Sequence, residues 1–324
     1  MIVTLPGLFD LQVNGFGGID FNGADLTADR VAEAFRRMRE TGVTRCLPTL
    51  ITSSFDRFAA SARILARVAD AAFAGIHMEG PYVSPADGAR GAHPLEHVAA
   101  ASVDDFRRRQ DAAEGRIVLV TLAPEVPGAL PLVEYLVAAE VRVAIGHTAA
   151  TPQQLGDAIA AGATLATHLG NGCPQMLPRH PNVIWELLAA DAVLASVIAD
   201  GHHLPAATVK TMVRAKSAER TILVTDAIAA AGCAPGRYTI GGVGCELGAD
   251  GRVSLPGTPY LAGSSLTLDR AIANTVRYTG LRLEAVIPMA STIPAAYLGM
   301  TTAGIVTASW DVEACEFSVR SVAA

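Results

Sequence analysis

Short apolar runs recur along the chain and are separated by longer segments with helical periodicity. Because the runs are nearly continuous rather than alternating, they are typical of strands buried on both faces of a parallel sheet. The segments between them, such as 28–42 and 55–72, place apolar residues at the spacing of amphipathic helices. The runs occupy residues 2–13, 44–51, 74–80, 116–124, 141–147, 164–168, 194–200 and 221–227.

Eight strand–helix units in succession predict a (β/α)8 barrel, the TIM-barrel fold, as a single domain over residues 1–324. One segment interrupts the alternation after the eighth strand. There, two alternating segments flank the turn Ala249-Asp250-Gly251, which predicts a β-hairpin inserted over 236–260. Helical segments follow, and residues 305–324 predict a short β-like tail.

Composition narrows the class of protein. Hydrophobic residues make up 51% of the chain and charged residues 17%, as in a compact enzyme and unlike a disordered or fibrous chain. The net charge of −6 gives no basic surface for nucleic acid, so we expect no nucleic-acid partner. The five cysteines include no CxxC pair and indicate a reducing compartment. With no secretion signal and no membrane-length apolar stretch, we expect a cytoplasmic protein without a membrane partner.

Polar residues end four of the predicted strands. Glu79, His147, His168 and Asp226 close the third, fifth, sixth and eighth runs. The chemistry of these barrels lies at the carboxyl ends of the strands, so we expect the four side chains to meet. A single histidine in such a place is more often structural. Two imidazoles and a carboxylate together have the composition of an open catalytic zinc site, and Glu79, His147 and His168 are the predicted ligands.

Asp226 has two possible roles. It could cap the alanine-rich turn that follows, which is a common role of aspartate. It could also accept a proton from water and return it to a leaving amine. A charged group at the end of a buried strand is costly unless it has a purpose, and this favours the catalytic interpretation.

Gln12 and Asn14 end the first predicted strand, where many two-metal barrels carry a His-x-His pair. Amides are poor ligands for a borderline metal ion. The sequence therefore predicts one divalent transition metal per chain, with Zn²⁺ as the expected ion.

Three further residues are candidates at the same rim. Arg179 follows the sixth strand in a proline-rich loop, where a guanidinium could bind phosphate through paired hydrogen bonds; it could equally be a surface residue. His93 and His203 follow the third and seventh strands, and each is weak evidence alone.

Taken together, the motifs resemble the N-acetylglucosamine-6-phosphate deacetylase family of the amidohydrolase superfamily. The similarity covers most of residues 6–270 in the order of that family. The matching segments are PGLFDLQVNGFGGIDF, HMEGPYVSP, GAHP, GHTAAT, THLGNGCP, IADGHHL, LVTDAIAAAG and LAGSSLTLD.

The resemblance implies roles for individual residues. Glu79, His147 and His168 would hold the metal, Asp226 would be the acid and base, and His93 would approach the amide carbonyl of the substrate. It also implies a homodimer, because phosphate ligands in such enzymes can come from a neighbouring subunit. The residues expected to bind the small-molecule substrate are Gln12, Asn14, Asn171, Gly172, Arg179 and His203.

Three departures from the family pattern accompany this resemblance. The usual N-terminal β segment is missing, since the first strand begins at the first residues, and the C-terminal part of the β-sandwich is shortened. The loop 169–173 and the residues after Arg179 also differ. The expected reaction is metal-dependent deacetylation of N-acetylglucosamine 6-phosphate. Two alternatives stay open: a deacylase of another, possibly unphosphorylated, N-acyl amino sugar or amine, and a non-catalytic sugar-phosphate-binding barrel.

Overall fold

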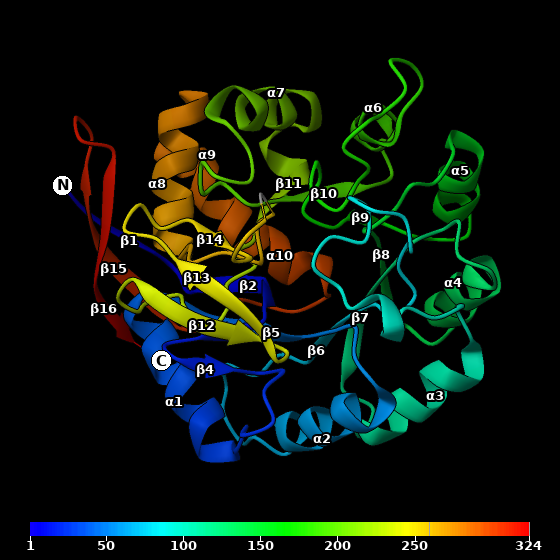
Figure 1. Cartoon of the computed structure of the whole chain (residues 1–324). Coiled ribbons are helices and arrows are strands. Elements are labelled where there is room, and N and C mark those ends of the chain that lie inside the picture. The colour runs from blue at the N-terminus through cyan, green and yellow to red at the C-terminus, as the bar shows by residue number, and fades with distance from the viewer. Residues whose placement is uncertain (259, 324) are drawn as a thin grey trace.

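An eight-stranded parallel barrel forms the centre of the computed structural model, which describes residues 1–258 and 260–323 (Figure 1). The strands follow one another around the barrel in chain order. A parallel bridge between Val13 and Ala227 closes the ring, and the Asn14 N–H donates to the Ala227 carbonyl at 2.7 Å. The predicted TIM barrel is confirmed. Its strands are β2 (Leu8–Val13), β5 (Val43–Ile51), β6 (Ile76–Glu79), β7 (Ile117–Leu122), β8 (Arg142–Ile145), β9 (Leu165–Ala166), β10 (Leu194–Val197) and β11 (Thr221–Leu223).

Helices cover the outside of the barrel, as Figure 1 shows. Their starts follow sequence signals: Thr27 caps the first helix, and Thr151 forms a capping box with Gln154. Each long helix buries one stripe, for example Val31, Ala34, Phe35 and Met38 on the first. The helices are α1 (Ala28–Glu40), α2 (Phe55–Ala66), α3 (Val103–Ala112), α4 (Ala129–Ala138), α5 (Pro152–Ala160), α6 (Val183–Ala189), α7 (Ala206–Lys216), α8 (Leu268–Thr279), α9 (Leu283–Val286) and α10 (Thr292–Tyr297), with 3₁₀ turns η1 (Leu95–His97), η2 (Ala218–Arg220) and η3 (Ile287–Ala290).

The prediction of one continuous strand over 2–13 is wrong. The strand is interrupted at Gly7, where an added Cβ would lie 2.1 Å from the carbonyl oxygen of Ala303. Residues before the break form β1 (Ile2–Pro6), which pairs with β15 (Ile305–Asp311), and β15 pairs with β16 (Glu316–Ala323). An N-terminal β segment is therefore present outside the barrel, and the expected tail is a β-hairpin. Ala324 lies outside the described residues.

Two small sheets lie beside the mouth of the barrel. One pairs β3 (Gly15–Phe16) with β4 (Ile19–Asp20), and the other is an antiparallel group of three strands. The predicted turn at Asp250 joins the second and third of these strands, but an additional turn at Gly241-Gly242 joins the first and second. The predicted insertion is thus a three-stranded sheet rather than one hairpin. Its strands are β12 (Gly236–Ile240), β13 (Val243–Leu247) and β14 (Val253–Ser254).

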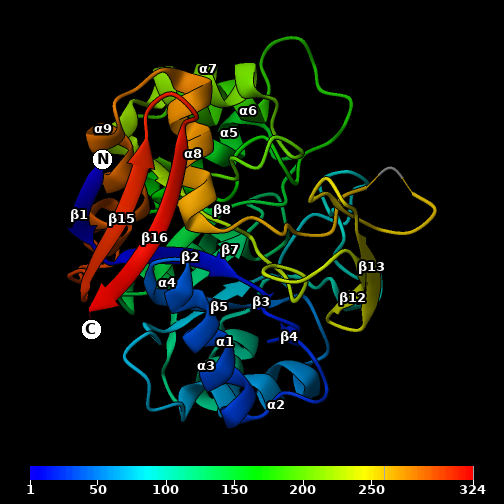
Figure 2. The ribbon, with the colours of Figure 1, turned by 90° about the vertical axis from the view of Figure 1, so that its left-hand side faces the viewer.

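The three-stranded insertion has its own hydrophobic cluster. Ile240, Cys245 and Leu247 pack with residues that follow the eighth barrel strand, and the partly buried Ile51 and Ala92 pack against them. Figure 2 shows this sheet on the side of the molecule opposite to β15 and β16. The insertion therefore covers one side of the barrel mouth. None of the described helices is long and apolar enough to cross a membrane.

Candidate active site

Three metal-competent side chains meet at the carboxyl end of the barrel. Glu79 is the last residue of β6, while His147 and His168 follow β8 and β9. All three are buried. Because these strands are parallel members of one ring, residues at their carboxyl ends point to a common mouth.

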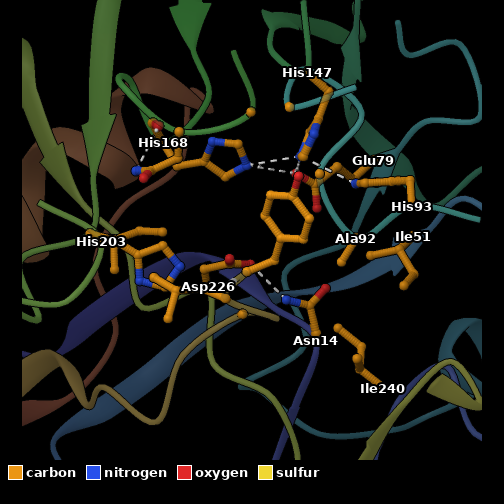
Figure 3. A pocket seen from close by; sticks show the side chains of 18 of the residues that line it. Asn14, Ile51, Glu79, Ala92, His93, His147, His168, His203, Asp226 and Ile240 are labelled. Carbon is orange, nitrogen blue, oxygen red and sulfur yellow. Dashed lines mark hydrogen bonds and ion pairs between the residues drawn. The ribbon is translucent and has the colours of Figure 1, made fainter. Parts of the chain in front are cut away.

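The distances among these side chains fit a bound cation. Glu79 Oε1 lies 3.2 Å from His147 Nε2 and 3.1 Å from His168 Nε2, and the two nitrogens lie 3.1 Å apart (Figure 3). Ligands placed about 2.0–2.2 Å from one zinc ion in a tetrahedral site are separated by roughly 3.4 Å. The three groups form a set in which a metal ion could be held.

The tautomer of His147 also suits a metal ligand. Its Nδ1 lies 3.0 Å from the carbonyl oxygen of Ala89, which can only accept a hydrogen bond. The proton therefore resides on Nδ1, and Nε2 offers its lone pair to the centre of the site.

Three residues of the site other than glycine have left-handed backbone conformations. The φ angles are 51° at His147, 30° at His168 and 51° at Asp226. Such angles are uncommon for residues other than glycine and concentrate at functional sites. In each case the left-handed residue lies just beyond the end of a barrel strand.

Asp226 accepts hydrogen bonds from both amides of the first barrel strand. Its Oδ1 receives Asn14 Nδ2 at 2.7 Å and Gln12 Nε2 at 3.2 Å. Gln12 Nε2 also lies 3.1 Å from Glu79 Oε1, so both amides act as donors to carboxylates. Burial, and next the charge of Glu79, raise the pKa of Asp226 to about 6, which suits proton exchange near neutrality.

His93 lies beside the metal-competent group. Its Nε2 is 3.2 Å from His147 Nε2, and its Nδ1 is 2.7 Å from the Thr52 hydroxyl. Burial, and next the charge of His147, lower the pKa of His93 to about 3. A neutral ring whose Nδ1 accepts from Thr52 carries its proton on Nε2 and can donate it to a ligand.

His203 is held by an aspartate that the sequence interpretation did not assign to the site. His203 Nδ1 lies 2.7 Å from Asp200 Oδ2, and Asp200 Oδ1 accepts the N–H groups of His202 and His203. Burial alone would raise the pKa of Asp200, but the hydrogen bond and charge of His203 lower it overall. A signal was present in the sequence, because Asp200 ends the seventh apolar run as Asp226 ends the eighth.

These groups surround a cavity of about 280 Å³. Asn14, Asn171, Gly172 and His203 line it, as do the metal-competent residues, His93 and Asp226. Gly172 is required by close approach, since an added Cβ would lie 2.9 Å from His147 Nδ1. The lining residues that sequence reasoning missed are Ile51, Gly88, Gly91, Ala92, Gln175, Ile198, Ile240, Tyr260, Leu261 and Gly263.

Two predicted substrate-binding residues do not line the cavity. Gln12 instead donates to Glu79 and Asp226, and Arg179 lies elsewhere. It is exposed on the loop between β9 and α6, which Figure 1 shows extending above α6. Among the described residues it does not line the cavity. Within one chain, the guanidinium is therefore not placed to bind a ligand beside His203.

A profile of the amidohydrolase family matches residues 3–311. The chain belongs to the amidohydrolase family. This amidohydrolase is 33% identical to N-acetylglucosamine-6-phosphate deacetylase of Lysinibacillus sphaericus, over 96% of this chain and 80% of that relative. It is 35% identical to N-acetylgalactosamine-6-phosphate deacetylase of Escherichia coli O157:H7, over 91% of this chain and 78% of that relative.

Solved structures show the same relationship. The N-acetyl-D-glucosamine-6-phosphate deacetylase of Mycobacterium smegmatis superposes on this amidohydrolase with a TM-score of 0.90 at 32% identity, covering 99% of this chain and 86% of the other. A single-residue mutant of that enzyme, in complex with N-acetyl-D-glucosamine-6-phosphate, superposes with a TM-score of 0.91 at 32% identity and covers 99% of this chain and 85% of the other.

Proposed function

We propose that this amidohydrolase removes the acetyl group from an N-acetyl amino sugar phosphate, with N-acetylglucosamine 6-phosphate as the principal candidate. The observation that carries the proposal is the position of Asp226 beside Glu79, His147 and His168. A buried carboxylate whose pKa is raised adjoins a metal-competent group within one cavity. Relatives that share 33–35% of its residues are named as deacetylases of such sugars.

We propose that Glu79, His147 and His168 hold one Zn²⁺ ion. Two imidazole nitrogens and one carboxylate are the donors of open catalytic zinc sites, and Gln12 and Asn14 use their amides on carboxylates instead. When bound, such an ion polarises a carbonyl and makes water more acidic.

The proton transfers are then assigned to residues of the chain. Asp226 accepts a proton from the attacking water and afterwards returns it to the departing nitrogen. His93 donates from Nε2 to the carbonyl oxygen as negative charge develops there. Asn14 orients Asp226, and its own Oδ1 is a buried acceptor without a partner among the described residues. A donor on the substrate would satisfy that oxygen.

Asn171, Gly172 and His203 are proposed to contact the sugar, with Gln12 and Asn14 beneath it. We further propose that the phosphate is bound by Arg179 of a second copy in a homodimer. The exposure of Arg179 outside its own cavity supports this arrangement, because a projecting loop can reach a neighbouring subunit.

We also propose a cytoplasmic location and a single domain. The five cysteines are free thiols, which is usual in a reducing compartment. One hydrophobic cluster includes residues from both ends of the chain, from Leu5 to Phe317.

The galactose epimer is a second candidate, because the relative named as an N-acetylgalactosamine-6-phosphate deacetylase is 35% identical to the chain. The test measures amine release from both N-acetylhexosamine 6-phosphates and from their unphosphorylated forms. Preference for one phosphorylated epimer would identify the substrate. Equal turnover of phosphorylated and free sugars would favour a deacylase of neutral N-acyl amino sugars, and binding without turnover would favour a non-catalytic barrel.

A further inference from the structure

The catalytic cavity has two chemically different sides. His203 lines one side, and its imidazole carries hydrogen-bonding groups (Figure 3). Ile51, Ala92 and Ile240 line the other side and offer only apolar surface. Figure 3 shows His203 on one side of Asp226, and these three apolar residues on the opposite side.

This division matches the two substituents of an amide. The alkyl part of the acyl group and the amine nitrogen are different substituents of the trigonal carbonyl carbon and diverge from it, so a substrate held between His93 and Asp226 extends toward both sides. Sugar hydroxyls lose free energy when they are buried without hydrogen-bond partners, and they belong on the side of His203. The acyl chain is apolar and belongs against the isoleucines.

We propose that Ile51, Ala92 and Ile240 form an acyl-binding subsite that limits the substrate to short, unbranched acyl groups. The inference rests on the proposed deacylase function and deepens it, because it assigns the residues that select the acyl group. The three come from the end of β5, the loop after β6 and the end of β12.

A second cavity adjoins the catalytic cavity at Ala92, one of these three apolar residues. Its volume is about 690 Å³, and it shares Gly91, Ala92, His93 and Tyr260 with the catalytic cavity. Thr52 and Gly241 line the second cavity, and they directly follow Ile51 and Ile240 in the chain.

Each isoleucine therefore adjoins, in the chain, a residue that lines the second cavity. Ile51 packs directly on the turn at Gly241 that follows Ile240, since a Cβ added at Gly241 would lie 3.3 Å from Ile51 Cδ1. Shortening either isoleucine would enlarge the apolar side of the catalytic cavity. A longer acyl chain could then occupy the added space.

The test compares kcat/KM for the N-acetyl, N-propionyl and N-butyryl forms of glucosamine 6-phosphate. One methylene group changes discrimination in an apolar pocket by roughly 10- to 200-fold. Wild type should therefore lose at least about 10-fold in kcat/KM from acetyl to butyryl. Ile51→Ala and Ile240→Ala should each raise the butyryl-to-acetyl ratio by about 10-fold or more.

Val243→Ala is the matched control, because Val243 lines the second cavity but not the catalytic one. It should leave the ratio unchanged. Ile51→Val and Ile240→Val remove one methyl each and should raise the butyryl-to-acetyl ratio by a smaller factor. They replace the alanine variants in the test if those do not fold. Unchanged ratios in every isoleucine variant, or an equal change in Val243→Ala, would overturn the subsite.

The two proposals can fail separately. If wild type hydrolyses all three acyl forms at similar rates, the deacylase function stands and the subsite is wrong. If it hydrolyses none of these or of other N-acyl amino sugars, both are wrong.

Discussion

The imidazole of His203 and the carboxylate of Asp200 form a hydrogen-bonded pair 2.7 Å apart at the rim of the catalytic cavity. Both side chains are 8% exposed, so little water competes for the hydrogen bond. The carboxylate fixes the proton on Nδ1 and leaves Nε2 free for a ligand.

Asp200→Asn should therefore raise KM more than it lowers kcat. Loss of a residue that orients a histidine costs roughly 10- to 100-fold at metal sites, and we expect a decrease of that size in kcat/KM. Nitrogen NMR of His203 should show a changed tautomer. His202→Ala is the control, since His202 does not line the catalytic cavity. A normal tautomer with normal kinetics would show that Asp200 has no positioning role.

Asp226→Asn should retain the fold and the metal but lower kcat by roughly 10²- to 10⁴-fold, the usual contribution of general acid–base catalysis. An asparagine oxygen can still accept from Asn14 and Gln12, which preserves the local geometry. Rates and metal content are measured on the same preparation. Near-normal turnover of Asp226→Asn would show that Asp226 only caps the following turn and is not the catalytic acid and base.

Purified protein should contain about one transition metal per chain by elemental analysis. His147→Ala and His168→Ala should lose metal and activity together, because each removes one of three protein ligands. A reproducible content of two metals per chain, removed together by a chelator, would contradict the single-metal assignment.

Arg179→Lys should weaken the binding of phosphorylated substrate and leave the binding of unphosphorylated substrate unchanged, because lysine lacks the planar fork of a guanidinium. If Arg179 acts from the partner subunit, mixing Arg179→Ala with Asp226→Asn protein should restore activity. After random exchange of subunits, one site in each mixed dimer has both native residues, so about a quarter of all sites should be active in such a symmetric dimer. No recovery after subunit exchange would place the phosphate ligand elsewhere.

The pH dependence of stability should report on Asp10. Burial raises the pKa of Asp10 from 3.8 to about 7, so the folded state favours the protonated form. Unfolded chains bind fewer protons between these values, and this contribution to stability is lost as pH rises from about 4 to about 7.

Asp10→Asn should remove that dependence, because the asparagine oxygen can still accept the N–H groups of Gln12 and Thr225 that Asp10 Oδ1 accepts at 3.2 Å. Its NH₂ group can donate to the Thr225 hydroxyl, which lies 2.6 Å from Asp10 Oδ2. The Tm of Asp10→Asn relative to wild type should increase from about pH 4 to about pH 8, a range that includes the whole transition. A constant difference would show that Asp10 titrates normally.

The barrel could be predicted from the sequence because each strand is a continuous apolar run, and a buried parallel sheet requires such runs. The meeting of four polar side chains could be predicted for a related reason, because residues at the carboxyl ends of parallel barrel strands lie at the same mouth. These side chains belong to Glu79, His147, His168 and Asp226. The break at Gly7 could not be predicted. It depends on the close passage of Ala303, which comes from the opposite end of the chain.

The apolar side of the cavity was also inaccessible to sequence reasoning. Ile51, Ala92 and Ile240 come from three distant segments, and none has a polar group that marks it. Only the packing of the insertion on the barrel mouth brings them together. Arg179 is the converse case, because its place in the proline-rich loop after the sixth strand suggested a phosphate ligand, while its side chain lies outside the cavity of its own chain.

The left-handed backbone at His147, His168 and Asp226 also has a consequence for protein engineering. A common route to a more stable enzyme is to place glycine wherever φ is positive, because glycine adopts that conformation without steric cost. Here that rule would also select the positions on which the proposed reaction depends. Glu114 and Glu140, with φ angles of 51° and 58° at the exposed surface, are among the places where the same substitution would spare the chemistry.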